Sequence, residues 1–139
     1  VAYEDASVTT SWTIDLHYPD PKNTRFFSGD EFKAVCNQEE IELYPIPYRC
    51  FYSRNVSNLF MAGRNISVTH VALGTVRVMR TTAMMGEVVG MAVCRRHDVL
   101  PRTVYTSYLP ELRSLMQKGC GQQDLPNNQQ FNIGRRKHH

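Results

Sequence analysis

The sequence predicts a mixed α/β fold, and three stretches of the chain indicate that class. Residues 12–18 alternate apolar and polar side chains, which is the period of a half-buried strand. The apolar run at 59–62 stops at Gly63, as a short buried strand does. A loop follows, and residues 76–96 then continue without proline as a helix-compatible segment. An apolar run ended by glycine, a loop and a helix are together typical of one half of a βαβ unit.

The amino-terminal half is expected to consist of short strands joined by loops. Strands are expected at residues 12–18, 39–43 and 48–53, with a loop at 21–29. Pro45 and Pro47 separate the last two strands, because proline forces extended backbone and cannot donate to a sheet. In the third strand, a period of two places Tyr48, Cys50 and Tyr52 on one face.

The first strand brings two titratable side chains to one face. Asp15 and His17 are two residues apart, so their Cα atoms lie about 6–7 Å apart in a strand. Asp15 can orient or charge the imidazole of His17, which exchanges protons near neutral pH. A solvated strand face is the alternative, and the pattern favours it.

In the second half, a loop is expected at 66–75 and a long helix at 76–96. Ala83, Gly86, Gly90 and Cys94 recur at spacings of three and four, so they share one face of this helix. Glycine inside a helix costs about 1 kcal/mol relative to alanine. Two glycines on one face therefore predict that another backbone, or a flat ligand, comes very close.

A second helix is expected at 107–118, after a break at 98–101. Ser107 is the expected cap and Gly119 the stop signal. Its apolar stripe consists of Leu109, Leu112, Leu115 and Met116. From Gly121 onward Gln, Asn, Pro and Gly dominate, which predicts a poorly ordered tail.

Composition excludes several classes of function. Net charge is +3, but Arg135, Arg136 and Lys137 supply three of these positive charges, so no nucleic-acid partner is expected. No charge-free run approaches the roughly 20 apolar residues that cross a membrane, so no membrane partner is expected. The cysteines show neither a CxxC pair nor zinc-ligand spacing, which predicts free thiols and no metal site. They are Cys36, Cys50, Cys94 and Cys120.

Five stretches occur in an order shared with a known family. They are residues 2–6 (AYEDA), 12–17 (WTIDLH), 44–50 (YPIPYRC), 58–79 (NLFMAGRNISVTHVALGTVRVM) and 86–92 (GEVVGMA). Together they resemble the carboxyl-terminal segment of FAD-dependent oxidoreductases of the glutathione-reductase-like superclass, over roughly residues 2–94. The resemblance implies strands of a substrate-binding sheet joined to the last strand and helix of an FAD-binding Rossmann-like domain.

The resemblance also implies an organisation for the chain. Residues 1–57 would belong to the substrate-binding antiparallel sheet, 58–120 to the carboxyl-terminal part of the FAD-binding domain, and 121–139 to the tail. Family members begin with a GxGxxG turn that holds the FAD pyrophosphate, and the eight glycines here do not form one. The expected partners are therefore the amino-terminal part of the same flavoprotein, which completes the enzyme, and a small organic substrate. The alternative is a non-catalytic α/β fragment or interaction module that binds no flavin by itself.

The implied cofactor contacts fall into two groups. Residues beside the ribityl chain and pyrophosphate are Ala62, Gly63, Arg64 and Asn65, and those in the first helical turn near the flavin ring are Val78, Met79, Thr81 and Thr82. Glycine permits close backbone approach and arginine adds a cation for phosphate. A helix amino terminus carries a partial positive charge, which stabilises an anionic reduced flavin. Many relatives have proline where Arg80 stands.

Five residues are candidates for catalysis and substrate binding. His70, in the loop expected to cross near the ring, would transfer a proton as hydride leaves the substrate, and His17 is the competing candidate. Relatives use His and Arg beside the flavin to bind carboxylates, which implies substrate contacts for Arg77, Arg80 and Arg49. The alternatives are a backbone-bonded loop histidine for His70 and ion pairs for Arg77 and Arg49.

Overall fold

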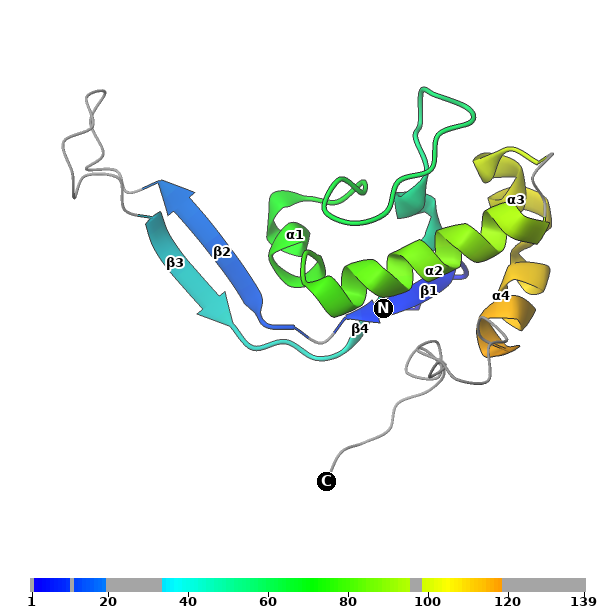
Figure 1. Cartoon of the computed structure of the whole chain (residues 1–139). Helices are drawn as coiled ribbons and strands as arrows, with labels where there is room; N and C mark the ends of the chain where they lie inside the picture. Colours follow the sequence, from blue (N-terminus) through cyan, green and yellow to red (C-terminus); the bar gives the residue numbers. More distant parts are fainter. Residues whose placement is uncertain (1, 11, 20–33, 96–98, 119–139) are drawn as a thin grey trace.

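The computed structural model describes residues 2–10, 12–19, 34–95 and 99–118 of the chain. Within these residues, four α-helices and two antiparallel two-stranded sheets form a mixed α/β fold (Figure 1), which confirms the predicted class. The strands are β1 (Ala6–Thr10), β2 (Ile14–Pro19), β3 (Ala34–Glu39) and β4 (Tyr44–Pro47). The helices are the 3-10 turn η2 (Tyr48–Phe51) and α1 (His70–Val76), α2 (Met79–Arg95), α3 (Pro101–Ser107) and α4 (Leu109–Lys118). The loop predicted at 21–29 and the tail from 121 lie outside the described residues.

One sheet and three helices form the part of the molecule that we call the block. Strand β1 pairs antiparallel with β4, with Ala6 opposite Pro47 and Thr10 opposite Tyr44. Both β1 and β4 are edge strands. Pro45 and Pro47 are tolerated in β4 because an edge strand does not need every backbone N–H for pairing. Helix α2 packs across β1 and against α4, and α3 packs against η2. The core of the block includes Val8, Ile46, Tyr48, Phe51, Met85, Val88, Val104 and Leu112.

The second sheet and α1 form the part that we call the arm, and α1 joins it to the block, because Val76 lies in the block's core and the Thr10 hydroxyl donates to the Thr75 carbonyl oxygen. Strands β2 and β3 pair antiparallel and extend away from the block in Figure 1. Helix α1 packs on β2 through Gly74, at which an added Cβ would lie 3.0 Å from Leu16 Cδ2 and 3.1 Å from the Asp15 carbonyl oxygen. The close approach that glycine permits therefore occurs at Gly74, where the arm's helix meets its sheet.

The structure corrects several of the expected strands in the first half. The expected strand at 48–53 is wrong, because Tyr48 and Phe51 are both buried and lie three residues apart on one side of the turn η2. The strand expected at 39–43 is also wrong, since β3 ends at Glu39. The extended backbone expected at Pro45 and Pro47 is confirmed as β4, and its partner β1 has no counterpart among the predictions.

The central segment also differs from the prediction. The run 59–62 is not a strand, and within it only Phe60 pairs, forming an isolated bridge with Tyr52. The described strands offer this run no parallel neighbour, which a buried βαβ strand requires. The loop expected at 66–75 contains α1, whose first turn is capped when the Thr69 side chain accepts from the Ala72 N–H.

The long helix is confirmed, but its small-residue face is open. Helix α2 buries Thr81, Met85, Val88 and Ala92, which recur at spacings of three and four. An added Cβ at Gly86 or Gly90 would meet no described atom within 4 Å. The close approach expected at this face is therefore not made by the described residues.

The carboxyl-terminal helical region is divided into two helices. Pro101 occupies the first turn of α3, where its missing N–H costs nothing. Ser107 ends α3, so it does not cap the second helix as expected. The predicted stripe of α4 is confirmed, with Leu112 and Met116 buried and Leu109 and Leu115 partly buried.

Candidate functional site

The two candidate catalytic histidines lie on opposite faces of strand β2, His17 as a residue of the strand and His70 as a residue of α1 beside it. The ring of His70, the first residue of α1, lies 5.3 Å from the Tyr18 ring. His70 is therefore a helical residue and not the loop residue expected. His17 points with Asp15 to the other face, because side chains alternate along a strand.

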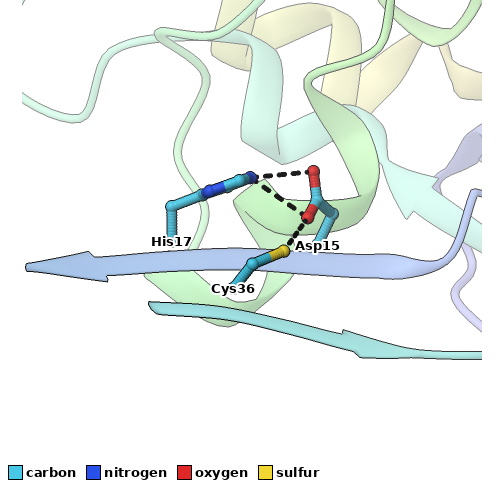
Figure 2. A group of neighbouring side chains, drawn as sticks. All are labelled: Asp15, His17 and Cys36. Atoms are coloured by element: carbon cyan, nitrogen blue, oxygen red, sulfur yellow. Dashed lines mark hydrogen bonds and ion pairs between the residues drawn. The ribbon is translucent and has the colours of Figure 1, made fainter. Parts of the chain in front are cut away.

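On that other face, Asp15, His17 and Cys36 form a compact cluster (Figure 2). Nε2 of His17 lies 3.1 Å from both carboxylate oxygens of Asp15. Cys36, which is directly opposite His17 on β3, donates its S–H to Asp15 Oδ1 at 3.1 Å. The structure thus confirms that Asp15 and His17 share a face, and it adds a thiol from the neighbouring strand.

Two further side chains surround the Asp15 carboxylate. Gln38 is directly opposite Asp15 on β3, and its Nε2 donates to Oδ1 at 3.5 Å. Arg77 follows α1 and donates from Nη2 to Oδ2 at 2.8 Å and to the Asp15 carbonyl oxygen at 3.0 Å. Arg77 therefore makes the ion pair that was the alternative to substrate contact.

The contacts of the cluster shift the pKa values of its acidic members. Hydrogen bonds from Cys36 and then from His17 lower the pKa of Asp15 to about 2. The hydrogen bond to Asp15 raises the pKa of Cys36 above its ordinary value, because a neighbouring carboxylate disfavours the thiolate. At neutral pH the face therefore holds an ionised carboxylate that accepts from a protonated thiol.

Arg49 has a different environment from the other candidates. It donates from Nη2 to Asp5 Oδ1 at 2.7 Å and from Nε to Oδ2 at 3.0 Å, and the Asp5 side chain is 0% exposed. Its guanidinium also lies over the Tyr3 and Tyr105 rings, at 6.0 and 5.4 Å. This is a bidentate structural ion pair, and the substrate contact expected for Arg49 stays a prediction.

The first group of expected cofactor residues lies in the loop between η2 and α1. Gly63 has φ of 97°, a backbone conformation that favours glycine. Ala62, Arg64 and Asn65 are exposed around it. The segment is held to η2 at both ends, because Met61 N donates to Phe51 O and Ser67 N to Cys50 O. These residues fit a phosphate or ribityl contact, since backbone and a cation are both accessible.

The second group lies at the start of α2, which begins one residue after the Val78 start that the resemblance implied and three residues after the start expected from the sequence pattern. Met79 is 88% exposed, whereas the Thr81 side chain is buried. The Thr82 hydroxyl donates to Met79 O at 2.9 Å, so it is engaged inside the turn. Arg80 is exposed in the same turn. What this turn can present to a ligand is its backbone N–H groups and the exposed Met79 and Arg80 side chains, and not the threonine hydroxyls.

A groove of about 490 Å³ lies between the β4–η2 segment and the start of α1. Its walls include Tyr44, Cys50, Val68 and Ala72. Tyr44 is fixed in place by a hydrogen bond to the Thr75 side chain. The groove is open to solvent and largely apolar, which suits a small organic molecule or the side chains of another protein segment.

Sequence reasoning missed Cys36 and Gln38 as members of a candidate site. Both are separated from Asp15 by more than 20 residues along the chain, and their proximity depends on the β2–β3 register. The run Ala34–Glu39 shows no alternation of apolar and polar residues, so no local signal predicted this pairing. Cys36, Cys50 and Cys94 are free thiols, as predicted, and Cys120 lies outside the described residues.

Among the described residues, no helix is both long and apolar enough to span a membrane. Neither the comparison with curated proteins nor that with solved structures found a match. A family model described as FAD dependent oxidoreductase matches residues 1–116. That match covers the arm, the block and the Gly63 loop together. The chain therefore belongs to the FAD dependent oxidoreductase family and is a portion of a flavoprotein oxidoreductase.

Proposed function

We propose that this chain supplies one side of a flavin site and transfers hydride from a small organic substrate within a larger flavoprotein. The observation that carries the proposal is the family match over residues 1–116 in a chain without a GxGxxG turn. The remaining part of the same flavoprotein would supply the GxGxxG turn that binds the pyrophosphate from the other side. FAD, when bound, supplies the hydride-accepting chemistry, and the chain's residues bind, orient and transfer protons.

Two segments would hold the cofactor. Ala62, Gly63, Arg64 and Asn65 would contact the ribityl chain and pyrophosphate with exposed backbone and one cation. The first turn of α2, residues 78–82, would direct backbone N–H groups at the flavin ring, because the first N–H groups of a helix lack intrahelical acceptors. The exposed Met79 would be covered when the site is complete.

The open face of α2 would contact the remaining part of the protein. Gly86 and Gly90 leave space for another backbone, and no described atom fills it. Glycine in a helix is less stable than alanine by about 1 kcal/mol, and a close contact with another backbone would offset this cost. We therefore place the missing nucleotide-binding part against this face and the substrate in or near the groove beside α1.

Binding of FAD to the 139-residue chain tests the first part of the proposal. We expect no tight binding in a titration followed by flavin fluorescence, because the pyrophosphate-binding turn is absent. The intact natural polypeptide should instead show a flavin absorption spectrum. Saturable micromolar binding to this chain alone, or a natural polypeptide without flavin, would contradict the proposal.

Substitution of the two histidines tests the proton-transfer role. In the complete flavoprotein, His70→Ala should keep its flavin but reduce it at least about tenfold more slowly, because a positioned acid or base contributes about 10² to 10⁴ in rate. His17→Ala is the matched control on the opposite face of β2. If only His17→Ala slows reduction, the proton-transfer residue is on the Asp15 face and the assignment to His70 is wrong.

A further inference from the structure

The Asp15 face of the arm brings together three ligand types that transition metals prefer. Asp15 Oδ1, His17 Nε2 and Cys36 Sγ all lie within 4.8 Å of one another. The register explains the arrangement, because His17 pairs directly with Cys36 and Asp15 is two residues away on the same face. The side chains point toward one another above the two strands (Figure 2).

The distances are close to those of a tetrahedral metal site. Zinc lies about 2.0–2.2 Å from nitrogen or oxygen ligands and about 2.3 Å from sulfur, which places neighbouring ligand atoms roughly 3.4–3.6 Å apart. His17 Nε2 and Cys36 Sγ each lie 3.1 Å from an Asp15 oxygen. Side-chain rotations that lengthen these separations by a few tenths of an ångström would accommodate the ion.

The surroundings of the cluster resemble the outer shell of a metal site. Arg77 holds Asp15 Oδ2 at 2.8 Å, so Oδ1 is the oxygen directed toward Cys36. Ligating carboxylates are themselves usually hydrogen-bonded, and such partners fix their orientation. The His17 side chain is 46% exposed and the Asp15 side chain 21% exposed, so an ion can enter from solvent.

We infer that Asp15, His17 and Cys36 form a binding site for a divalent transition metal, with zinc the best fit to this ligand set. Imidazole together with thiolate selects zinc over magnesium or calcium. Three protein ligands leave a fourth position for water or another small oxygen ligand. On binding, Cys36 gives its thiol proton to solvent and coordinates as thiolate, so one metal ion enters as one proton leaves.

Titration of the reduced 139-residue chain with Co²⁺ tests the site directly. We expect one equivalent to produce a thiolate-to-cobalt charge-transfer band and the visible bands of tetrahedral cobalt, and zinc should abolish both. The background variant carries His138→Ala and His139→Ala, because the two terminal histidines are potential metal ligands of their own. Absence of saturable one-to-one binding in that background would overturn the inference.

Single substitutions identify the ligands. Cys36→Ser should remove the charge-transfer band, while Cys94→Ser, which changes another exposed thiol, should keep it. His17→Gln should weaken zinc binding by more than about 100-fold, and Gln38→Ala, which removes only a long outer hydrogen bond of 3.5 Å, by about tenfold. Circular dichroism verifies that each variant is folded. A band that survives Cys36→Ser or disappears in Cys94→Ser would place the metal elsewhere and refute the site.

Discussion

Two aspartate–arginine pairs in this molecule use the same chemistry in different ways. In the block, the Asp5 carboxylate is 0% exposed and accepts from Nε, Nη2 and the backbone N–H of Arg49. In the arm, Asp15 is 21% exposed and shares its two oxygens among Arg77, His17, Cys36 and Gln38.

The difference indicates which pair stabilises the fold and which is available to a ligand. Among the described residues, Arg49 alone supplies both the charge and the side-chain hydrogen bonds that the Asp5 carboxylate receives. The backbone carbonyl of Asp5 accepts from the Tyr48 N–H at 2.7 Å. The Asp5 carboxylate is buried and already accepts three hydrogen bonds from Arg49, so it is not accessible to a ligand from solvent. Asp15 is surrounded by a thiol and an imidazole, which a metal ion can convert from hydrogen-bond partners into ligands.

The largest effect is expected from Arg49→Ala. It leaves the buried Asp5 carboxylate without its cation, which should cost about 3 kcal/mol in a denaturant melt, at the low end for a buried pair because the Arg49 side chain is 46% exposed. The matched change in the arm, Arg77→Ala, should cost clearly less, since Asp15 stays partly solvated and keeps its other partners. Equal losses for the two variants would mean that the pairs are equivalent and that the comparison fails.

Gly74→Ala tests how tightly the arm's helix packs on its sheet. The added methyl group would lie 3.1 and 3.2 Å from the backbone oxygen and nitrogen of Asp15, and backbone cannot move away as a flexible side chain can. We expect a loss of about 1–3 kcal/mol in unfolding free energy from overpacking. Unchanged or increased stability would show that α1 and β2 separate at little cost.

Tyr48→Phe probes the buried core of the block through the pH dependence of its stability. The Tyr48 hydroxyl donates to Pro101 O at 3.0 Å, so its loss should cost about 1 kcal/mol near neutral pH. Burial raises the pKa of Tyr48 above the ordinary value of 10.0. Above about pH 10 the unfolded chain therefore binds fewer protons than the folded chain, and stability falls as pH rises.

The expected signature is a smaller alkaline loss of stability in Tyr48→Phe than in the wild type. Some loss should persist, because burial also raises the pKa of Tyr44. Denaturant melts at neutral pH and above pH 10 measure both quantities. A variant whose alkaline loss equals that of the wild type would show that Tyr48 ionises without unfolding the block.

The smallest effect is expected at the open face of α2. In this chain, Gly86→Ala should increase stability by up to about 1 kcal/mol, because no described atom lies within 4 Å of the added Cβ. Gly86→Ala is the matched counterpart of Gly74→Ala, which makes the same change where the helix is tightly packed. In the complete flavoprotein the gain should vanish or reverse if another backbone covers this face. A gain in both contexts would mean that the face is solvent-exposed throughout.

Local patterns predicted those elements whose sequence period matches their environment. The alternation at 12–18 identified β2, and the spacing of Leu112 and Met116 identified the buried stripe of α4. In each case one face of the element is buried and the other is solvated, so hydrophobic periodicity reports the structure directly.

Other elements depend on contacts between distant residues. Helix α1 contains valine, threonine and glycine, which are weak helix formers, and it is stabilised by packing Gly74 on β2. The sequence of η2 has the alternation typical of a strand. In the structure it forms a 3-10 turn, because Tyr48 and Phe51 are buried on the same side. The glycines show the same limit, because the residue type signals a close approach without indicating which glycine makes it.

The sequence by itself determined the fold class, the family and the shared face of Asp15 and His17, because each is recorded in neighbouring residues or in ordered motifs. Only the tertiary structure decided that Cys36 and Gln38 join that face and that Arg49 pairs with Asp5. Those relations depend on strand register and on the burial of one carboxylate but not the other. Register and burial are properties of the packed chain, and no local run of residues specifies them.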